Sequence, residues 1–230
     1  TSPGESATKG DEESAARHHL QLKLLGTPEI TLDGVRLEAV ERSHRAGMLL
    51  YILALHPRGL SGERLGAYMA SDSIDLDAFD TDAGLGVGTV RTFIWRLRKI
   101  VGWHGIVVSP GEHGGCQNRY RLPEGTTCDL WAFEHNLDEA ARLAIGARED
   151  PGTAHRAAAF RQEAILLYRG DFCKGVSAGC ISHAAEQLRN RYLTAVLKQA
   201  TYWKDEASRL RVAREGRRST SEPSVEEKNA

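Results

Sequence analysis

Four basic side chains lie close together in the segment GTVRTFIWRLRKIVG, residues 88–102, and they are Arg91, Arg96, Arg98 and Lys99. The planar guanidinium group of arginine donates hydrogen bonds in a fork that matches phosphate groups and the edges of guanine. These residue types at this spacing suit a helix that lies in a DNA groove. A packing helix with a solvated basic face has the same composition, so the neighbouring elements must distinguish the two.

The apolar residues of this segment predict how it anchors in a protein. At about 100° per residue they share roughly one third of a helix, and they are Val90, Phe93, Ile94, Leu97, Ile100 and Val101. The opposite side holds Thr92, Trp95 and Lys99, with Arg96 on one flank and Arg91 and Arg98 on the other. A recognition helix needs this division, because one face packs on the protein while the other reaches the DNA.

Strands and two helices are expected before the basic segment. Apolar residues alternate or cluster in 20–26 and 28–38, which predicts strands, and Asp33-Gly34 is a typical two-residue hairpin turn. The apolar run in 42–57 predicts a helix that stops at Pro57. Residues 61–70 predict a second, short helix with Ser61 as its N-cap.

A β-hairpin is expected after the basic segment. Residues 105–110 and 118–122 predict two strands around the glycine-rich tip GEHGG. Arg119 and Arg121 lie beside that turn and suit a wing that reaches the DNA backbone or the minor groove. The order of strands, three helices and a hairpin predicts an α+β fold of the winged helix-turn-helix type.

Several segments resemble a known family of bacterial regulators. VRTFIWRLRKIVG is similar to the third helix of OmpR-type winged helices, and NRYRL resembles the end of their wing. CDLWAFEHNLDEA, EAILLYRGDF and AAEQLRNRYLTAVLKQA resemble the junction and the helical bacterial transcriptional activation domain (BTAD) of SARP-type activators. The resemblance covers about Leu20 to Lys204. It implies that Arg96, Arg98 and Lys99 match the basic residues of the helix that enters the major groove.

Composition and resemblance together divide the chain into four parts. Residues 1–19 and 207–230 are small, polar and charged, and are expected to be disordered tails. Residues 20–125 are expected to form the OmpR-type winged-helix DNA-binding domain, and 126–206 a BTAD-like helical domain that resembles a truncated tetratricopeptide array.

Three helices are expected in the second domain, in residues 129–147, 152–168 and 181–203. Helix pairs of this kind stack into arrays whose surfaces bind partners. The chain turns polar after Trp203. We therefore expect an exposed apolar edge near Leu193, Val196 and Leu197 that binds a partner.

An acidic segment precedes the basic one and contains Asp72, Asp75, Asp77, Asp80 and Asp82. The resemblance implies a loop that contacts RNA polymerase, whereas a solvated insertion is the simpler interpretation. Five carboxylates would repel a phosphate backbone unless the loop points away from the DNA. The glycine and glutamate that a calcium-binding EF-hand loop requires are missing.

Bulk composition excludes several other classes of function. The net charge of −1 excludes a basic coat over the whole chain, so any nucleic-acid site must be local. The four cysteines form no CxxC pair, which fits a reducing cytoplasm. His113, Cys116 and Cys128 lack a fourth zinc ligand at usable spacing. No catalytic motif stands in a persuasive context, so we expect no enzyme, no metal and no cofactor.

The sequence therefore predicts a cytoplasmic, DNA-binding transcriptional regulator, more specifically an activator. Its expected partners are double-stranded DNA, RNA polymerase and a second copy bound through the helical domain, with no membrane contact in this segment. A protein-interaction module that no longer binds DNA is the alternative, because Trp95 and the upstream aspartates could obstruct docking.

Overall fold

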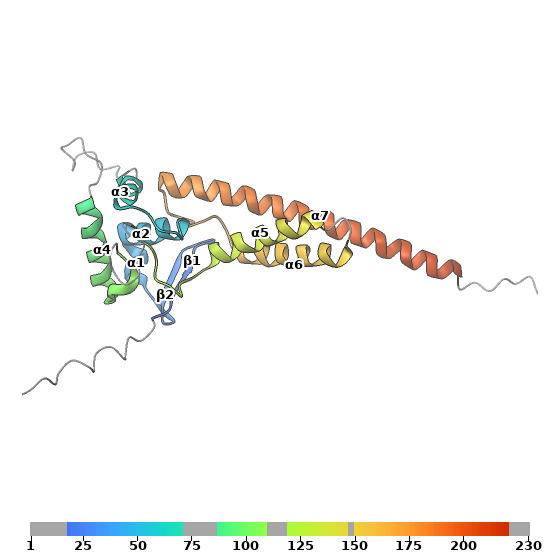
Figure 1. The fold of residues 1–230 in the computed structure, drawn as a ribbon, viewed down its shortest axis with the longest axis horizontal. Coiled ribbons are helices and arrows are strands. Elements are labelled where there is room, and N and C mark those ends of the chain that lie inside the picture. Colours follow the sequence, from blue (N-terminus) through green and yellow to red (C-terminus); the bar gives the residue numbers. More distant parts are fainter. Residues whose placement is uncertain (1–17, 71–86, 110–118, 147–149, 221–230) are drawn as a thin grey trace, which may run out of the picture. The chain divides into compact units, whose positions relative to one another are not determined.

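The computed structural model describes residues 18–70, 87–109, 119–146 and 150–220 (Figure 1). The fold is α+β, with strands near the N-terminus followed mostly by helices. The chain divides into two compact units. Unit 1 comprises Thr1–Lys23 and Glu29–Cys128, and unit 2 comprises Leu24–Pro28 and Asp129–Ala230. The predicted acidic loop, with all five of its aspartates, lies outside the described residues.

A small sheet in unit 1 has the strand order β3-β2-β1-β4. Its strands are β1 (Leu20–Lys23), β2 (Glu29–Leu32), β3 (Val35–Arg36) and β4 (Thr127–Cys128). The two hairpin neighbours of β2 are antiparallel to it, whereas β4 returns parallel to β1. Asp33 and Gly34 have φ values of 52° and 81°, as a type I′ turn requires. The predicted hairpin is confirmed.

Helix α1 (Glu38–Arg42) was not expected from the sequence, and one of its carboxylates ties it to the sheet. Glu41 accepts a hydrogen bond of 2.8 Å from the backbone N–H of Ile30 in β2. The same carboxylate lies 2.9 Å from the guanidinium of Arg36 in β3. Five residues are too few to show a helical period, which explains why this helix was missed.

Three helices build the core of unit 1, namely α2 (His44–Leu55), α3 (Gly62–Ala70) and α4 (Val87–Val101). Nine consecutive residues of α2, Ala46–Ala54, are buried, because α1, α3 and α4 all pack against this helix. Helix α2 ends before Pro57, and Ser61 Oγ accepts the N–H of Arg64 at 3.4 Å. Both predicted helix boundaries are confirmed.

The expected hairpin after α4 is reduced to isolated β-bridges in the described residues. Val108 pairs antiparallel with Arg121, and Tyr120 pairs with Leu60 from the segment before α3. The strand prediction is wrong for residues 105–106, which belong to a 3₁₀ helix, His104–Ile106. Gly59 allows the pairing with Tyr120, because an added Cβ would meet the Tyr120 carbonyl oxygen at 2.7 Å and φ is +78°.

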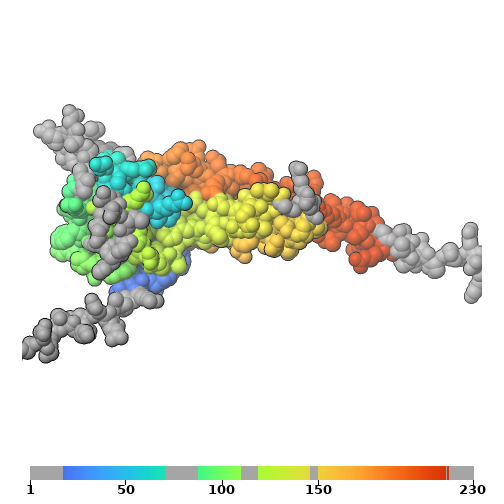
Figure 2. All heavy atoms as spheres, in the orientation of Figure 1, coloured from blue at the N-terminus to red at the C-terminus, as the bar shows by residue number. Residues whose placement is uncertain are grey.

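The described residues of unit 2 form the helices α5 (Asp129–Gly146), α6 (Pro151–Leu167) and α7 (Gly179–Thr220). Asp150 caps α6 by accepting the N–H groups of Gly152 and Thr153, and Pro151 follows it at the first helical position. Helix α7 extends past α5 and α6 (Figure 2). It continues to Thr220, so the disordered tail predicted from residue 207 is corrected over 207–220.

The segment Leu24–Pro28 joins unit 2 through the first residue of α5. The carboxylate of Asp129 accepts the backbone N–H groups of Leu24 at 2.7 Å and Leu25 at 3.1 Å. Arg169 donates to the same carboxylate at 3.2 Å. Leu25 also forms an antiparallel bridge with Phe172. The segments CDLWAFEHNLDEA and EAILLYRGDF therefore supply the contacts that attach Leu24–Pro28 to unit 2.

Asp171, in the same LYRGDF segment, links α6 to α7. It accepts hydrogen bonds from the Tyr168 hydroxyl at 3.0 Å and from Arg189 Nε at 2.8 Å. The Arg189 guanidinium lowers the pKa of Asp171, and Tyr168 lowers it further. Burial, with the hydrogen bond to Asp171, raises the pKa of Tyr168 to about 12. The Tyr168 ring also stacks on Tyr192 with 4.2 Å between centroids.

Candidate nucleic-acid interface

Helix α4 packs on unit 1 through the face that its periodicity predicts. Val90, Phe93, Ile94 and Leu97 are buried, as expected. The prediction is wrong for Ile100, whose side chain is 44% exposed. Arg98 takes the inner position instead, because it reaches the segment that follows the helix.

The outer face of α4 carries an exposed row of polar and basic side chains. Thr92, Trp95, Arg96 and Lys99 are exposed and follow the spacing i, i+3, i+4, i+7, and Arg91 is exposed beside them. We call these five residues the α4 outer row. They come together because the buried residues fix which way the helix faces.

Trp95 is the most unusual member of the α4 outer row, since 57% of its surface is exposed. Lys99 Nζ lies 5.3 Å from the centroid of its ring, within range of a cation–π contact. The two side chains thus form an apolar and a positive group side by side. Thr92 Oγ1 donates to the carbonyl oxygen of Gly88 at 3.1 Å, one turn earlier.

The charges of Arg91 and Arg96 are not compensated within the described part of the chain, where neither residue makes an ion pair. Guanidinium groups of this kind can donate to phosphates and to base edges. Arg91 and Arg96 therefore have guanidinium donors available to an anionic partner in the described part of the chain.

Arg98 differs from its neighbour two residues earlier. Its guanidinium donates to the Val107 carbonyl oxygen at 2.8 Å and to Ser109 Oγ at 3.0 Å. The side chain is half-buried, and these bonds hold residues 107–109 against the end of α4. Arg98 thus positions the backbone from which Val108 pairs with Arg121.

The two arginines predicted for the wing also differ from each other. Arg119 is exposed, and its Nη1 lies 3.3 Å from the Gly59 carbonyl oxygen. Arg121 is 18% exposed and pairs with Glu124 at 3.3 Å. Arg119 is therefore the more available of the two for a partner.

One basic residue near α4 was missed by the sequence analysis. Arg45, in the first turn of α2, is exposed, and its guanidinium carbon lies 5.1 Å from the centroid of the Phe93 ring. The available signal was the basic start of the predicted helix in RSHRAG. It was overlooked because α2 is otherwise apolar.

The described residues hold no group of three or more His, Cys, Asp or Glu side chains that could bind a metal ion. Three residues could in principle contribute to a zinc site. His113 and Cys116 lie outside the described residues, and Cys128 is buried. Among the described helices, none is both long enough and apolar enough to cross a membrane.

No known protein-family profile matches the chain. Over 185 residues, or 80% of its length, it is 27% identical to an uncharacterized 47.3 kDa protein in the thcA 5′ region of Rhodococcus erythropolis. The matched part is 33% of that protein, so the chain spans about a third of this relative's length.

Proposed function

We propose that the chain is a sequence-specific, DNA-binding transcriptional regulator whose unit 1 is a winged helix-turn-helix. In this proposal α3 and α4 are the helix-turn-helix pair, and α4 enters the major groove. The observation that carries it is the α4 outer row, exposed on a helix whose opposite face is buried. Helices that read DNA are divided in the same way.

The members of the outer row have different roles in this proposal. Arg96 and Arg91 donate to guanine edges and phosphates, because their charges are uncompensated among the described residues. Lys99 contacts a phosphate, and Trp95 packs on a sugar or a thymine methyl group. Arg119 reaches the backbone as part of the wing, whereas Arg98 positions the wing from inside.

Selection of bound fragments from a genomic DNA library tests this function. We expect the whole chain to enrich discrete fragments, and Arg96→Ala to lose that enrichment. Arg142→Ala is a matched control, because Arg142 is an exposed arginine of unit 2 that pairs with Glu139 at 2.6 Å. Failure of the unchanged chain to enrich any fragment at low salt would contradict the proposal.

The alternative is a protein-interaction module, and the exposure of Trp95 favours it. A large aromatic side chain at the centre of an exposed row is typical of protein interfaces. Trp95→Ala distinguishes the two functions. It creates or strengthens DNA binding if Trp95 obstructs docking, as the protein-interaction module requires, and weakens DNA binding if Trp95 packs against the DNA.

We propose a second copy of the chain as the partner of unit 2, bound along α7. Six apolar residues of α7 follow a heptad spacing of alternating three and four residues, and they are Leu193, Val196, Ala200, Trp203, Ala207 and Leu210. Leu193, Trp203 and Leu210 are each about half exposed or more. In a parallel pair of such helices, Glu206 of one copy faces Arg211 of the other, so the charges are complementary.

A further inference from the structure

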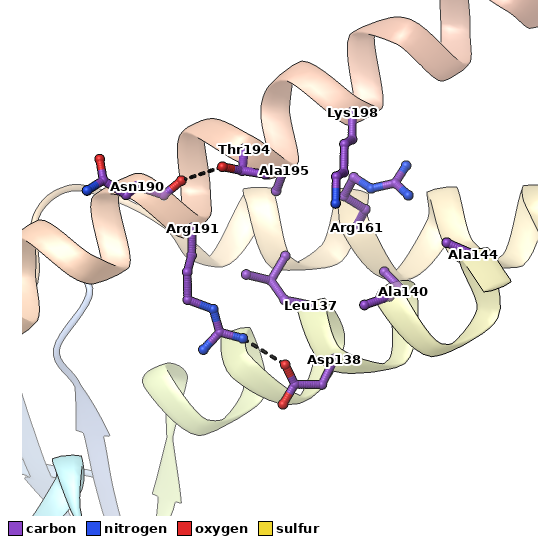
Figure 3. A pocket seen from close by; sticks show the side chains of 11 residues that line it. Leu137, Asp138, Ala140, Ala144, Arg161, Asn190, Arg191, Thr194, Ala195 and Lys198 are labelled. Carbon is purple, nitrogen blue, oxygen red and sulfur yellow. Dashed lines mark hydrogen bonds and ion pairs between the residues drawn. The ribbon is translucent and has the colours of Figure 1, made fainter.

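A cavity of about 430 Å³ lies within unit 2 between α5, α6 and α7 (Figure 3). Small side chains create it, since Ala140, Ala141 and Ala144 of α5 lie opposite Ala195 of α7. With Leu137 these residues form an apolar lining. Its volume falls in the range of sites that bind small molecules, which is roughly 300–1,000 Å³.

A buried arginine from α6 also lines this cavity. Arg161 is only 9% exposed, and burial lowers the pKa of its guanidinium. Its one hydrogen bond among the described residues is to Gln199 Oε1, at 3.1 Å. A guanidinium has five N–H donors, so a neutral amide oxygen satisfies neither its hydrogen-bonding capacity nor its charge.

A second cation from α7 joins Arg161 at the cavity. Lys198 extends from α7 toward the helix that carries Arg161 (Figure 3). It makes no ion pair within the described parts of the chain. The cavity thus has two positive groups whose charges are not compensated among the described residues.

The third cation of the lining, Arg191, differs from Arg161 and Lys198 because its charge is compensated by carboxylates of unit 2. Arg191 donates to Glu134 at 2.8 Å and to Asp138 at 2.7 Å, both on α5. Arg191 therefore bridges α7 to α5. Asp138 is the one carboxylate in the cavity lining, and its partner is Arg191 rather than Arg161 or Lys198.

We propose that this cavity binds a small amphipathic anion, with its carboxylate or phosphate head at Arg161 and Lys198 and its apolar body against Leu137 and the alanines. An anionic head supplies the acceptors and the negative charge that Gln199 does not. The apolar body fills space that the alanine side chains leave open. This site does not depend on DNA binding by unit 1.

Isothermal titration calorimetry of the whole chain tests the site, with octanoate, octyl phosphate and 1-octanol as probes. We expect at least one of the two anions to bind one site per chain, at least tenfold more tightly than 1-octanol. Octanoate and octyl phosphate together distinguish a carboxylate ligand from a phosphate ligand. Equal affinity for 1-octanol, or no binding of either anion up to about 10 mM, would overturn the proposal.

Variants locate the bound probe. Arg161→Met and Lys198→Met are each expected to weaken anion binding at least tenfold. Lys204→Met, which changes an exposed lysine of α7 outside the cavity lining, is expected to leave it unchanged. Because Lys198 is exposed, its variant reports on the site even where Arg161→Met does not fold. Wild-type affinity in Lys198→Met would exclude this cavity as the site.

Discussion

Arg96 and Arg98 stand two residues apart in α4 and have different surroundings. Arg96 is exposed and makes no ion pair among the described residues, whereas Arg98 is half-buried and bonded to Val107 and Ser109. The pattern Arg-Leu-Arg does not tell these roles apart. The contact that separates them is made with residues 107–109, after the helix has ended.

Arg96→Ala is expected to weaken binding to a selected DNA fragment by about 1–3 kcal/mol, the usual contribution of a good base contact. Its free energy of unfolding is expected to change by less than about 0.5 kcal/mol, because the side chain is exposed. Fluorescence anisotropy and urea unfolding measure the two quantities. A loss of stability without a loss of affinity would assign Arg96 a structural role.

Unlike Arg96→Ala, Arg98→Ala is expected to lower the free energy of unfolding. It removes two hydrogen bonds from a charged donor, so the free energy of unfolding should fall by about 1–3 kcal/mol. Urea unfolding of this variant beside Arg96→Ala measures the difference. Unchanged stability in Arg98→Ala would show that its bonds to Val107 and Ser109 do not support the fold.

Asp171 is expected to make the stability of the chain depend on pH. Its folded pKa lies below its ordinary value of 3.8, so its contribution is present above about pH 4 and is lost as the pH falls through the folded pKa. Asp171→Asn should therefore lower Tm at pH 7 and reduce the acid-induced fall in Tm. Thermal unfolding between about pH 2 and 7 measures this. If Asp171→Asn lost Tm on acidification as the unchanged chain does, the pH-dependent contribution of Asp171 to stability would be contradicted.

Helix α7 is expected to pair with α7 of a second copy of the chain. Leu193→Glu together with Leu210→Glu places carboxylates on the exposed heptad row, and like charges facing each other oppose pairing. We expect the unchanged chain to sediment as a dimer at micromolar concentration and the variant as a monomer. Leu166→Glu, on an exposed residue of α6, is the matched control. A monomeric unchanged chain would contradict the proposed partner.

The sequence predicts those elements whose signals are local. The apolar run of α2, the apolar period of α4 and the Asp33-Gly34 turn depend on neighbouring residues alone, so these were expected correctly. The extension of α7 past Trp203 was not expected, because the sequence becomes mostly polar and charged after that residue. Residues with good helix propensity continue the helix to Thr220, although none of those whose burial is described is buried.

The sites were predictable only in part, for a related reason. The exposed face of α4 follows from its period, but the inward turn of Arg98 depends on residues that come later in the chain. From the sequence alone, Arg161 cannot be distinguished from an ordinary surface residue of α6. Its burial and its place in the cavity arise from the packing of α5 and α7, which no short segment encodes.

At the scale of the whole molecule, the charge is nearly balanced at −1. Attraction to DNA must therefore come from the local field of the α4 outer row and Arg119 rather than from the net charge. Such binding releases counterions from the phosphates that the protein contacts. The number of phosphate contacts can then be calculated from the salt dependence of the DNA affinity.

A titration of a selected fragment at several salt concentrations tests the central proposal most directly. With roughly four to six phosphate contacts, the logarithm of the binding constant should fall with the logarithm of salt concentration at a slope of about −4 to −5. Arg91→Ala should make that slope shallower by about 1 if Arg91 contacts a phosphate, while Arg142→Ala should leave it unchanged. The same slope in both variants would exclude a phosphate contact by Arg91, and a slope near zero for the unchanged chain would contradict DNA binding through α4.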